Sequence, residues 1–318
     1  MKAIFLGILA SFFFAFTFIL NRSMELSGGS WIWSASLRFI FMVPLLLIVV
    51  MLRGNLRALF KEMQRQPWKW ILWSFVGFVL FYVPITFAAA YGPGWLIAGT
   101  WQITIVAGVL LTPFFYKTTE TSTGIIKQRQ RIPLKSLITS FVILIGVMLI
   151  QVQHANHFSI ALLIATVSPV LIAAFAYPLG NRKMMEICRG RLDTFQRVLG
   201  MTLASLPFWL MLCIYGAVYE GRPSVQQIIQ TWIVALTAGV IATILFFWAT
   251  DMAKDYPKKL AAVESTQSGG VVFTVIGEYY LLSISIPSGL SLIGLILITG
   301  GIVLHSNMTH KRRLAVNS

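Results

Sequence analysis

Apolar residues run along this chain in stretches of about twenty, and short polar segments separate the stretches. A helix needs roughly 20 mostly apolar residues to cross the hydrocarbon core of a bilayer. We therefore predict ten transmembrane helices, with ends defined to within a few residues. The predicted helices cover residues 2–20, 31–52, 68–90, 94–116, 134–152, 158–180, 198–219, 228–250, 260–282 and 286–305.

The connections between these helices are too short to fold into a soluble domain with its own core. The longest are residues 53–67, 117–133 and 181–197. The first apolar run follows Lys2, as in a secretory signal peptide, but it is longer than a usual signal core and no small-residue cleavage site follows it. We therefore expect an all-α integral membrane protein and no enzymatic domain outside the bilayer.

Composition and charge agree with a membrane protein. Of the 318 residues, 57% are hydrophobic and only 11% are charged, whereas soluble domains have roughly 25% charged residues. Of the 25 Lys and Arg residues, all except Arg22, Arg38 and Arg222 fall on the side that holds both termini. By the positive-inside rule, we expect a multi-pass protein of the cell membrane with both termini cytoplasmic. The net charge of +15 then orients the chain in the lipid bilayer and indicates no nucleic-acid partner.

The two halves of the chain carry related residues in the same order. The halves are residues 1–155 and 156–318, each with five predicted helices. Because five is an odd number, the second copy would enter the membrane upside down, which is the inverted repeat of secondary transporters. The matches, at shifts of 159 to 165 residues, are Asn21-Arg22 with Asn181-Arg182, Arg38 with Arg197, Tyr82 with Phe247, Tyr91 with Tyr256 and Gln102 with Gln267.

Several stretches resemble a known family. They are AFTFILNRSMELSGG, SASLRFIFMVP and AAAYGPGWLIAGTWQITIVAGVLLTPFF in the first half, and AYPLGNRKM and DMAKDYPKKLAAVESTQSGGVVF in the second. The chain is similar over nearly its whole length to the drug/metabolite transporter superfamily, and within it to the putative multidrug resistance efflux transporter family. The resemblance implies ten helices in two inverted five-helix repeats and efflux of small organic molecules.

Glu264 is a rare acid within a predicted transmembrane helix. In small four-helix relatives of the superfamily, a glutamate in the first helix binds protons and cationic drugs, but residues 2–20 contain no acid. At 100° per residue, Glu264 shares a helix face with Gln267 and Glu278, and we interpret Glu278 as a helix-end group. Glu264 is expected either to line a central cavity and take up protons, or to pair with a basic residue near the surface. The basic residues in reach are Lys258, Lys259 and Arg197.

Five further residues complete the candidate substrate site. Gln102 and Gln267 would orient a polar substrate, or would join helices by hydrogen bonds. Trp101 and Trp248 would supply aromatic walls. Arg38 would contact an anion or an acid, or would reach the headgroups from the outer end of its helix.

We expect a secondary transporter of small organic molecules, a proton-coupled efflux pump for drugs or metabolites. An acid among aromatic rings suits a cationic, lipophilic substrate, and the paired glutamines suit a neutral metabolite equally well. The alternatives are an uptake carrier or facilitator for a polar metabolite, and a membrane sensor that transports nothing. No cofactor or metal is expected, no P-loop sequence occurs, and the oligomeric state, including a homodimer, stays open.

Overall fold

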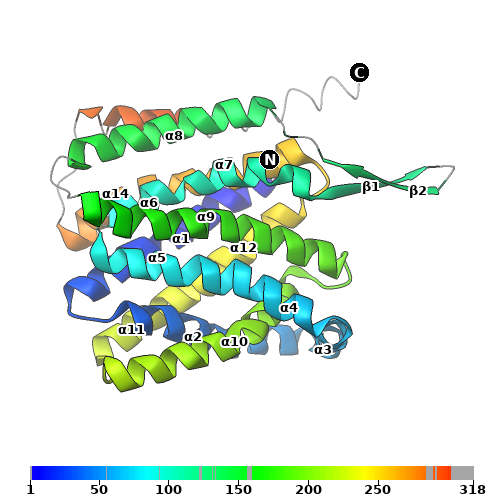
Figure 1. Cartoon of the computed structure of the whole chain (residues 1–318), viewed down its shortest axis with the longest axis horizontal. Coiled ribbons are helices and arrows are strands. Elements are labelled where there is room, and N and C mark those ends of the chain that lie inside the picture. The colour runs from blue at the N-terminus through cyan, green and yellow to red at the C-terminus, as the bar shows by residue number, and fades with distance from the viewer. Residues whose placement is uncertain are drawn as a thin grey trace.

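The structure is a computed structural model in which the helices run side by side along one direction (Figure 1). It describes residues 2–54, 56–92, 94–121, 124–130, 132, 134–155, 160–283, 289–290 and 292–301. Six described helices are long and apolar enough to cross a membrane: Lys2–Leu26, Trp31–Leu52, Pro67–Tyr91, Ile164–Cys188, Thr194–Tyr219 and Val225–Asp251. Three shorter apolar helices cover Leu96–Leu110, Ser140–Leu149 and Leu292–Gly301. The chain is thus a multi-pass helical membrane protein.

Several of the long helices are built from consecutive shorter elements. The first half contains α1 (Lys2–Leu26), α2 (Trp31–Leu52), α3 (Leu56–Arg65), α4 (Pro67–Ser74), η1 (Phe75–Val79), α5 (Leu80–Tyr91), α6 (Gly94–Trp101), α7 (Ile103–Leu110), η2 (Thr112–Phe114), β1 (Tyr116–Thr121), β2 (Gly124–Arg129) and α8 (Leu134–Ala155). The second half contains α9 (Ile160–Cys188), α10 (Thr194–Tyr219), α11 (Val225–Val234), η3 (Ala235–Ala242), α12 (Thr243–Asp251), α13 (Pro257–Ser265), η4 (Thr266–Ser268) and α14 (Gly269–Leu282).

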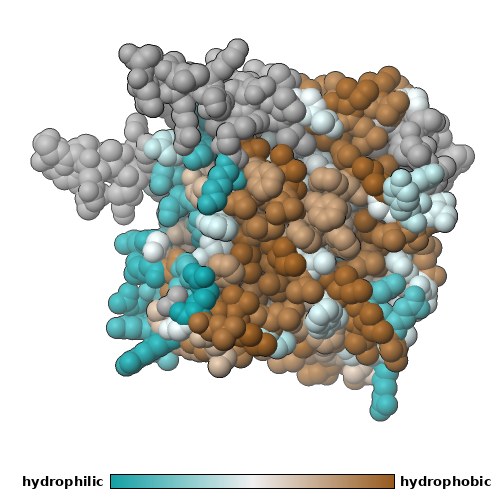
Figure 2. Space-filling model, turned by 180° about the vertical axis from the view of Figure 1, so that it is seen from behind, coloured by the Kyte–Doolittle hydropathy of each residue, from teal (hydrophilic) through white to brown (hydrophobic). Residues whose placement is uncertain are grey.

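The outer surface of the bundle is apolar around its middle. Figure 2 shows a broad hydrophobic area with hydrophilic residues gathered toward the two ends of the helices. Large apolar side chains such as Leu52, Met211 and Ile214 are exposed on the molecule. Lipid tails are the solvent that makes such exposure favourable, so this surface fits a bilayer.

Two helices extend past the ends that the sequence predicts. α1 continues to Leu26 rather than residue 20, and α9 continues to Cys188 rather than residue 180. The polar pairs that indicated helix ends lie inside these helices instead. Asn21 is buried and donates to the Tyr82 hydroxyl at 3.3 Å, and Asn181 is buried and donates to Thr250 Oγ1 at 3.2 Å. A polar side chain can lie inside a buried helix when it has a hydrogen-bond partner, and here other helices supply that partner.

The predicted connection at 117–133 contains a short β-hairpin, which adds to an otherwise helical chain. β1 and β2 pair as an antiparallel hairpin in which Tyr116 lies opposite Arg129. The hairpin projects beyond the end of the helical bundle (Figure 1). At its base, Arg129 Nε donates to the Pro113 carbonyl at 2.6 Å, which ties β2 to η2.

Departures from α-helical geometry recur at corresponding positions of the two halves. η1 and η3 are π-helical and begin at Phe75 and Ala235, which are related by the 160-residue shift that also relates Asn21 to Asn181. The boundary of α6 and α7 at Gln102 corresponds, at a shift of 165 residues, to η4, a 3₁₀ turn that contains Gln267. Such interruptions of a helix are frequent at functional sites.

Glycines allow one very close contact between helices. A Cβ added to Gly180 of α9 would overlap the backbone of Gly77 in η1, and a Cβ at Gly77 would lie 3.3 Å from the Gly180 Cα. The two backbones therefore touch directly, as at small-residue helix crossings in membranes.

Replacing Gly180 tests this crossing. Gly180→Ala should lower the free energy of unfolding by about 1–3 kcal/mol, because neither backbone can move without disturbing its packing. Gly300→Ala is the matched control, since nothing lies within 4 Å of its added Cβ. Melting temperatures of the purified variants in detergent measure the effect, and equal values for both variants would contradict the close crossing.

A buried carboxylate joins α3 to the segment between α9 and α10. Glu62 is buried and accepts hydrogen bonds from Arg191 Nε at 2.9 Å and from Arg65 Nη1 at 3.2 Å. The hydrogen bond from Arg191, followed by the charges of both arginines, lowers the pKa of Glu62 below its ordinary value of 4.5 despite the opposing effect of burial.

This cluster predicts an acid-sensitive contribution to stability. A carboxyl with a lowered folded-state pKa stabilises the fold above pH 4.5, and the contribution disappears as the pH falls through that lowered pKa. Both arginines are partly exposed, so we expect about 1 kcal/mol at pH 7. Glu62→Gln should remove this contribution, so the melting temperature of the variant should depend less on pH between pH 7 and pH 3.5. Glu186→Gln, at an exposed ion pair with Lys183, is the control, and a Glu62→Gln profile parallel to that of the wild type would refute the assignment.

Candidate functional site

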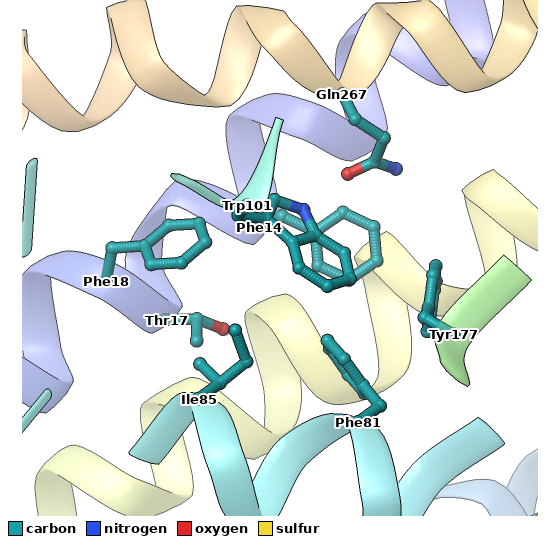
Figure 3. Close-up of a pocket in the computed structure, with 8 residues that line it drawn as sticks. All are labelled: Phe14, Thr17, Phe18, Phe81, Ile85, Trp101, Tyr177 and Gln267. Atoms are coloured by element: carbon teal, nitrogen blue, oxygen red, sulfur yellow. The ribbon is translucent and has the colours of Figure 1, made fainter. Parts of the chain in front are cut away.

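A pocket lies in the interior of the bundle, between elements of both halves of the chain (Figure 3). α1, α5 and α6 of the first half and α9 and η4 of the second half supply its walls. The lining residues are Phe14, Thr17, Phe18, Phe81, Ile85, Trp101, Tyr177 and Gln267. The pocket is narrow in this conformation, with room for about one water molecule.

Aromatic rings from four helices meet at the pocket. The ring of Phe81 lies 4.6 Å from that of Tyr177 and 5.0 Å from that of Trp101, centre to centre. Phe14 of α1 meets Tyr177 edge-on at 6.4 Å. These inclined and edge-on arrangements are the ones that aromatic pairs prefer, and they give the pocket flat apolar walls.

Three buried polar atoms at the pocket have no hydrogen-bond partner in the described part of the chain. They are Thr17 Oγ1, the Tyr177 hydroxyl and Gln267 Nε2. The Gln267 amide points from η4 toward the aromatic rings (Figure 3). Leaving a buried polar group unpaired costs roughly 1–3 kcal/mol, so a bound molecule that supplies partners gains this energy back. The pocket therefore has both apolar walls and specific hydrogen-bonding positions.

The candidate residues other than Glu264 and Arg38 separate into those at the pocket and those away from it. Trp101 and Gln267 line it. Gln102 is buried at the boundary of α6 and α7, where Nε2 donates to the Ala98 carbonyl at 2.9 Å and Oε1 has no partner. Trp248 lies on α12 and does not line this pocket: it is 42% exposed, and the Lys2 ammonium lies 5.2 Å from its ring centre.

Glu264 is held by a buried arginine. Arg182 Nε and Nη2 donate to Glu264 Oε1 at 2.9 and 2.7 Å, and Nη2 also reaches Oε2. Both side chains are about 5% exposed. Glu264 thus has an ion-pair partner, Arg182, whereas the expected partners Lys259 and Arg197 bind elsewhere. Lys259 donates to the Met252 carbonyl, and Arg197 pairs with Asp251 at 2.7 Å.

Helix extension and a glycine together create this ion pair. Arg182 is in reach because α9 continues past residue 180, so a residue that the sequence assigns to a loop lies inside the bundle. On the other side of Glu264, a Cβ at Gly108 of α7 would collide with Oε2. The pair consequently joins α7, α9 and α13, about one helical turn from Gln267 of the pocket.

One expectation was that Arg38 reaches the headgroups. The residue is only 1% exposed, so it lies inside the bundle instead. Its guanidinium stacks on the ring of Tyr82, with Cζ 3.9 Å from the ring centre. Nε and Nη1 have no acceptor among the residues that the structure describes. Arg38 is therefore a buried cation whose hydrogen-bonding capacity is largely unused.

Glu278 is a second buried acid that the sequence interpretation left as a helix-end group. It is 2% exposed, and no described residue forms a hydrogen bond with Oε1. A Cβ at Gly94 of α6 would lie 2.5 Å from this oxygen, so the glycine leaves room for the carboxyl. The signal that singled out Glu264, an acid in an apolar run, applies equally to Glu278. The pocket residues Phe14, Thr17, Phe81 and Tyr177 carried no such signal, because aromatic residues occur throughout the chain.

Comparison with known proteins identifies the class. A family model described as "Putative multidrug resistance efflux transporter" matches residues 1–311. The chain therefore belongs to this family, as its sequence motifs predicted, and is a small-molecule transporter of the membrane by family and by helix content.

Individual relatives cover most of the chain. It is 64% identical over 313 residues to "Uncharacterized protein YjlA" of Bacillus subtilis (strain 168), a match of 98% of this chain and 97% of the relative. It is 54% identical over 285 residues to an "Uncharacterized 42.1 kDa protein in intracellular alkaline protease 3'region" of Shouchella clausii, with 89% of this chain and 74% of the relative aligned. A solved crystal structure shares the fold, with a TM-score of 0.71 and 16% identity over 98% of both chains.

The Arg182–Glu264 pair can be tested by a double-mutant cycle. Glu264→Gln and Arg182→Gln should each lower the free energy of unfolding by about 3–5 kcal/mol, because each leaves a buried charge without its partner. The double variant should recover much of this loss, since no charge then remains. Thermal or chemical unfolding in detergent measures all four proteins, and losses that simply add would show that the two side chains act independently.

Proposed function

We propose that this protein is a secondary transporter that moves small organic molecules across the cell membrane through the pocket at Trp101, Tyr177 and Gln267. The carrying observation is the position of the pocket between elements of both halves, with aromatic walls and three unpaired buried polar atoms. Secondary transporters bind substrate at such an interface between repeats and expose it alternately to the two sides.

The proposal includes an inverted repeat of five helices, with ten transmembrane helices in all, residues 1–155 and 156–318 being the two copies. Three observations support it. Asn21 and Asn181 each donate to one residue of α5 or α12 in their own half, Asn21 to Tyr82 and Asn181 to Thr250. Arg38 and Arg197 lie over corresponding rings, Tyr82 at 3.9 Å and Phe247 at 5.1 Å. Finally, π-helical segments and breaks at Gln102 and Gln267 recur in the same order.

In this arrangement both termini are cytoplasmic, as the distribution of Lys and Arg favours. The Arg182–Glu264 pair then lies between the pocket and the cytoplasm, while Glu278 lies on the other side of Gln267 along the same chain segment. We propose that the ion pair closes the cytoplasmic side of the pocket, and that opening it requires Glu264 to exchange Arg182 for a proton.

Two buried acids are thus available for coupling to protons. Glu264 has a cationic partner, whereas Glu278 has an unpaired oxygen beside Gly94. A buried carboxyl without a partner is favoured in its protonated form, because an isolated charge is expensive inside a membrane. Efflux in exchange for protons follows if protonation and substrate compete for the same conformations.

Reconstitution into liposomes tests the proposal. Compounds that raise the melting temperature of the purified protein are selected first, since a ligand of the folded state stabilises it. Each is then added to proteoliposomes that contain the pH dye pyranine. A proton-coupled transporter should change the internal pH when the compound is added. Compound uptake without a pH change would indicate the facilitator, and binding without uptake would indicate the sensor.

Matched glutamate variants then locate the coupling site. Glu264→Gln and Glu278→Gln are each expected to reduce the compound-dependent pH change at least about tenfold. Binding of the compound should persist in both variants. Glu186→Gln, which alters an exposed carboxylate, should behave as the wild type. Each protein is compared per amount of folded material, because Glu264→Gln also loses stability. Full proton flux in both variants would exclude these two acids from coupling.

A further inference from the structure

Arg38 lacks the acidic partner that its counterpart in the other half has. Arg197 donates to Asp251 at 2.7 Å and lies over the Phe247 ring. The residue that corresponds to Asp251 in the first half, at the 165-residue shift, is Thr86. Thr86 Oγ1 donates to the backbone carbonyls of Tyr82 and Val83, and it carries no charge, so it does not replace the carboxylate of Asp251.

The acids that the structure describes do not compensate Arg38 either. Five of them, Glu62, Glu186, Asp193, Asp251 and Glu264, form ion pairs, and the partners are Arg53, Arg65, Arg182, Lys183, Arg191 and Arg197. No ion pair joins Arg38 to any acid of the described residues. Glu278 lies on α14, which packs against α1, α6 and η4, whereas Arg38 of α2 lies over Tyr82 of α5. Arginine stays protonated in proteins, so this buried side chain keeps its charge. Buried charges normally have a hydrogen-bond acceptor, so a buried arginine without one indicates a position where a bound ligand supplies the acceptor.

Unpaired polar atoms connect Arg38 to the pocket. Tyr82, on which Arg38 stacks, accepts a hydrogen bond from Asn21 Nδ2, and Asn21 Oδ1 has no partner. One turn earlier on α1, Thr17 Oγ1 is also unpaired and lines the pocket. Phe81, next to Tyr82, is another pocket residue. Thr17, Asn21 and Arg38 thus form a row of polar side chains, which we name the polar track, that leads from the pocket toward α2.

We propose that Arg38 binds the anionic group of the transported molecule, and that the substrate is an aromatic carboxylate. The rings of the pocket take its flat apolar part, and its carboxylate accepts hydrogen bonds from Arg38 and from the Thr17 hydroxyl, since Asn21 Oδ1 is itself an acceptor. Planar guanidinium groups that stack on one face bind carboxylates through the N–H groups at their edge. The assignment rests on the proposed role of the pocket as the substrate site.

The same charges disfavour a cation. Arg182 and Arg197 are each neutralised by an acid, Glu264 and Asp251, so Arg38 leaves positive charge unbalanced beside the pocket. No acid lines the pocket, and Glu264 is occupied by Arg182. Aromatic walls alone attract cations weakly compared with the repulsion of a buried like charge. The cationic lipophilic substrate considered from the sequence is therefore not favoured by this arrangement.

Three indoles of similar size and different charge test the proposal on the full-length protein in detergent. At pH 7, indole-3-acetate is anionic, indole-3-acetamide is neutral and tryptamine is cationic. Thermal shifts over a concentration series should show that wild type binds indole-3-acetate about ten- to hundredfold more tightly than the other two, the worth of a charge-assisted hydrogen bond. Arg38→Gln should lose that preference, and exposed Arg222→Gln should retain it.

The wild-type series is decisive even if Arg38→Gln does not fold. Equal binding of the three indoles, tighter binding of tryptamine, or no binding of any would each overturn the aromatic-carboxylate assignment. Inorganic phosphate is a fourth ligand in the series. If it stabilises wild type as strongly as indole-3-acetate and depends on Arg38, the site belongs to a free inorganic anion and the proposal fails.

Trp101→Ala separates this inference from the proposed function. It removes a wall of the pocket and leaves Arg38 and Tyr82 in place. If Trp101→Ala weakens the indoles and Arg38→Gln changes nothing, only the role of Arg38 is wrong. If Trp101→Ala binds the same indoles as wild type with unchanged affinity, the pocket is not the substrate site, and the proposed function itself is wrong.

Discussion

The ion pair between Arg182 and Glu264 organises the centre of this protein. Neither charge is tolerable alone in a bundle surrounded by lipid, so α9 and α13 are held together wherever the two side chains meet. Gly108 of α7 gives the carboxylate its space, which adds a helix from the first half to the contact. The 3₁₀ turn η4 follows directly and directs Gln267 into the pocket. The position of the pocket is therefore coupled to the integrity of one buried charge pair.

Several buried hydroxyl groups of the bundle are satisfied within their own helix. Ser36, Thr100 and Thr202 are buried, and each donates to the carbonyl four residues earlier in its own helix. This local bond satisfies a polar side chain without any tertiary partner. Thr17 and Tyr177 at the pocket, like Arg38 beyond it, have polar atoms without such a partner. Other buried polar atoms of the described residues, such as Trp70 Nε1 and Ser74 Oγ, are unpaired too, and those of Thr17, Tyr177 and Gln267 are distinguished by lining the same narrow space.

The interruptions of the helices lie beside this site. Gln102 separates α6 from α7 directly after Trp101, and η4 separates α13 from α14 at Gln267. Broken helices near the midplane are the means by which transporters place polar groups and hinges at the substrate. The two breaks come from different halves of the chain, so relative movement of the halves would widen the narrow pocket and change its exposure.

Hydropathy alone determined that the chain is a multi-pass helical membrane protein, because apolar runs of spanning length have few alternatives in lipid. The motifs determined the family, and the spacing of Gln102 and Gln267 indicated two related halves. The sequence also singled out Glu264, Trp101 and Arg38, because charged or ring-bearing residues in apolar runs need partners. Only the tertiary structure decided who those partners are. Arg182 was assigned to a loop, and Glu278 to a helix end, since a polar residue has the same appearance in sequence whether water or another helix satisfies it. Burial of a polar atom, and whether a distant helix supplies its partner, is a property of packing that no local pattern contains.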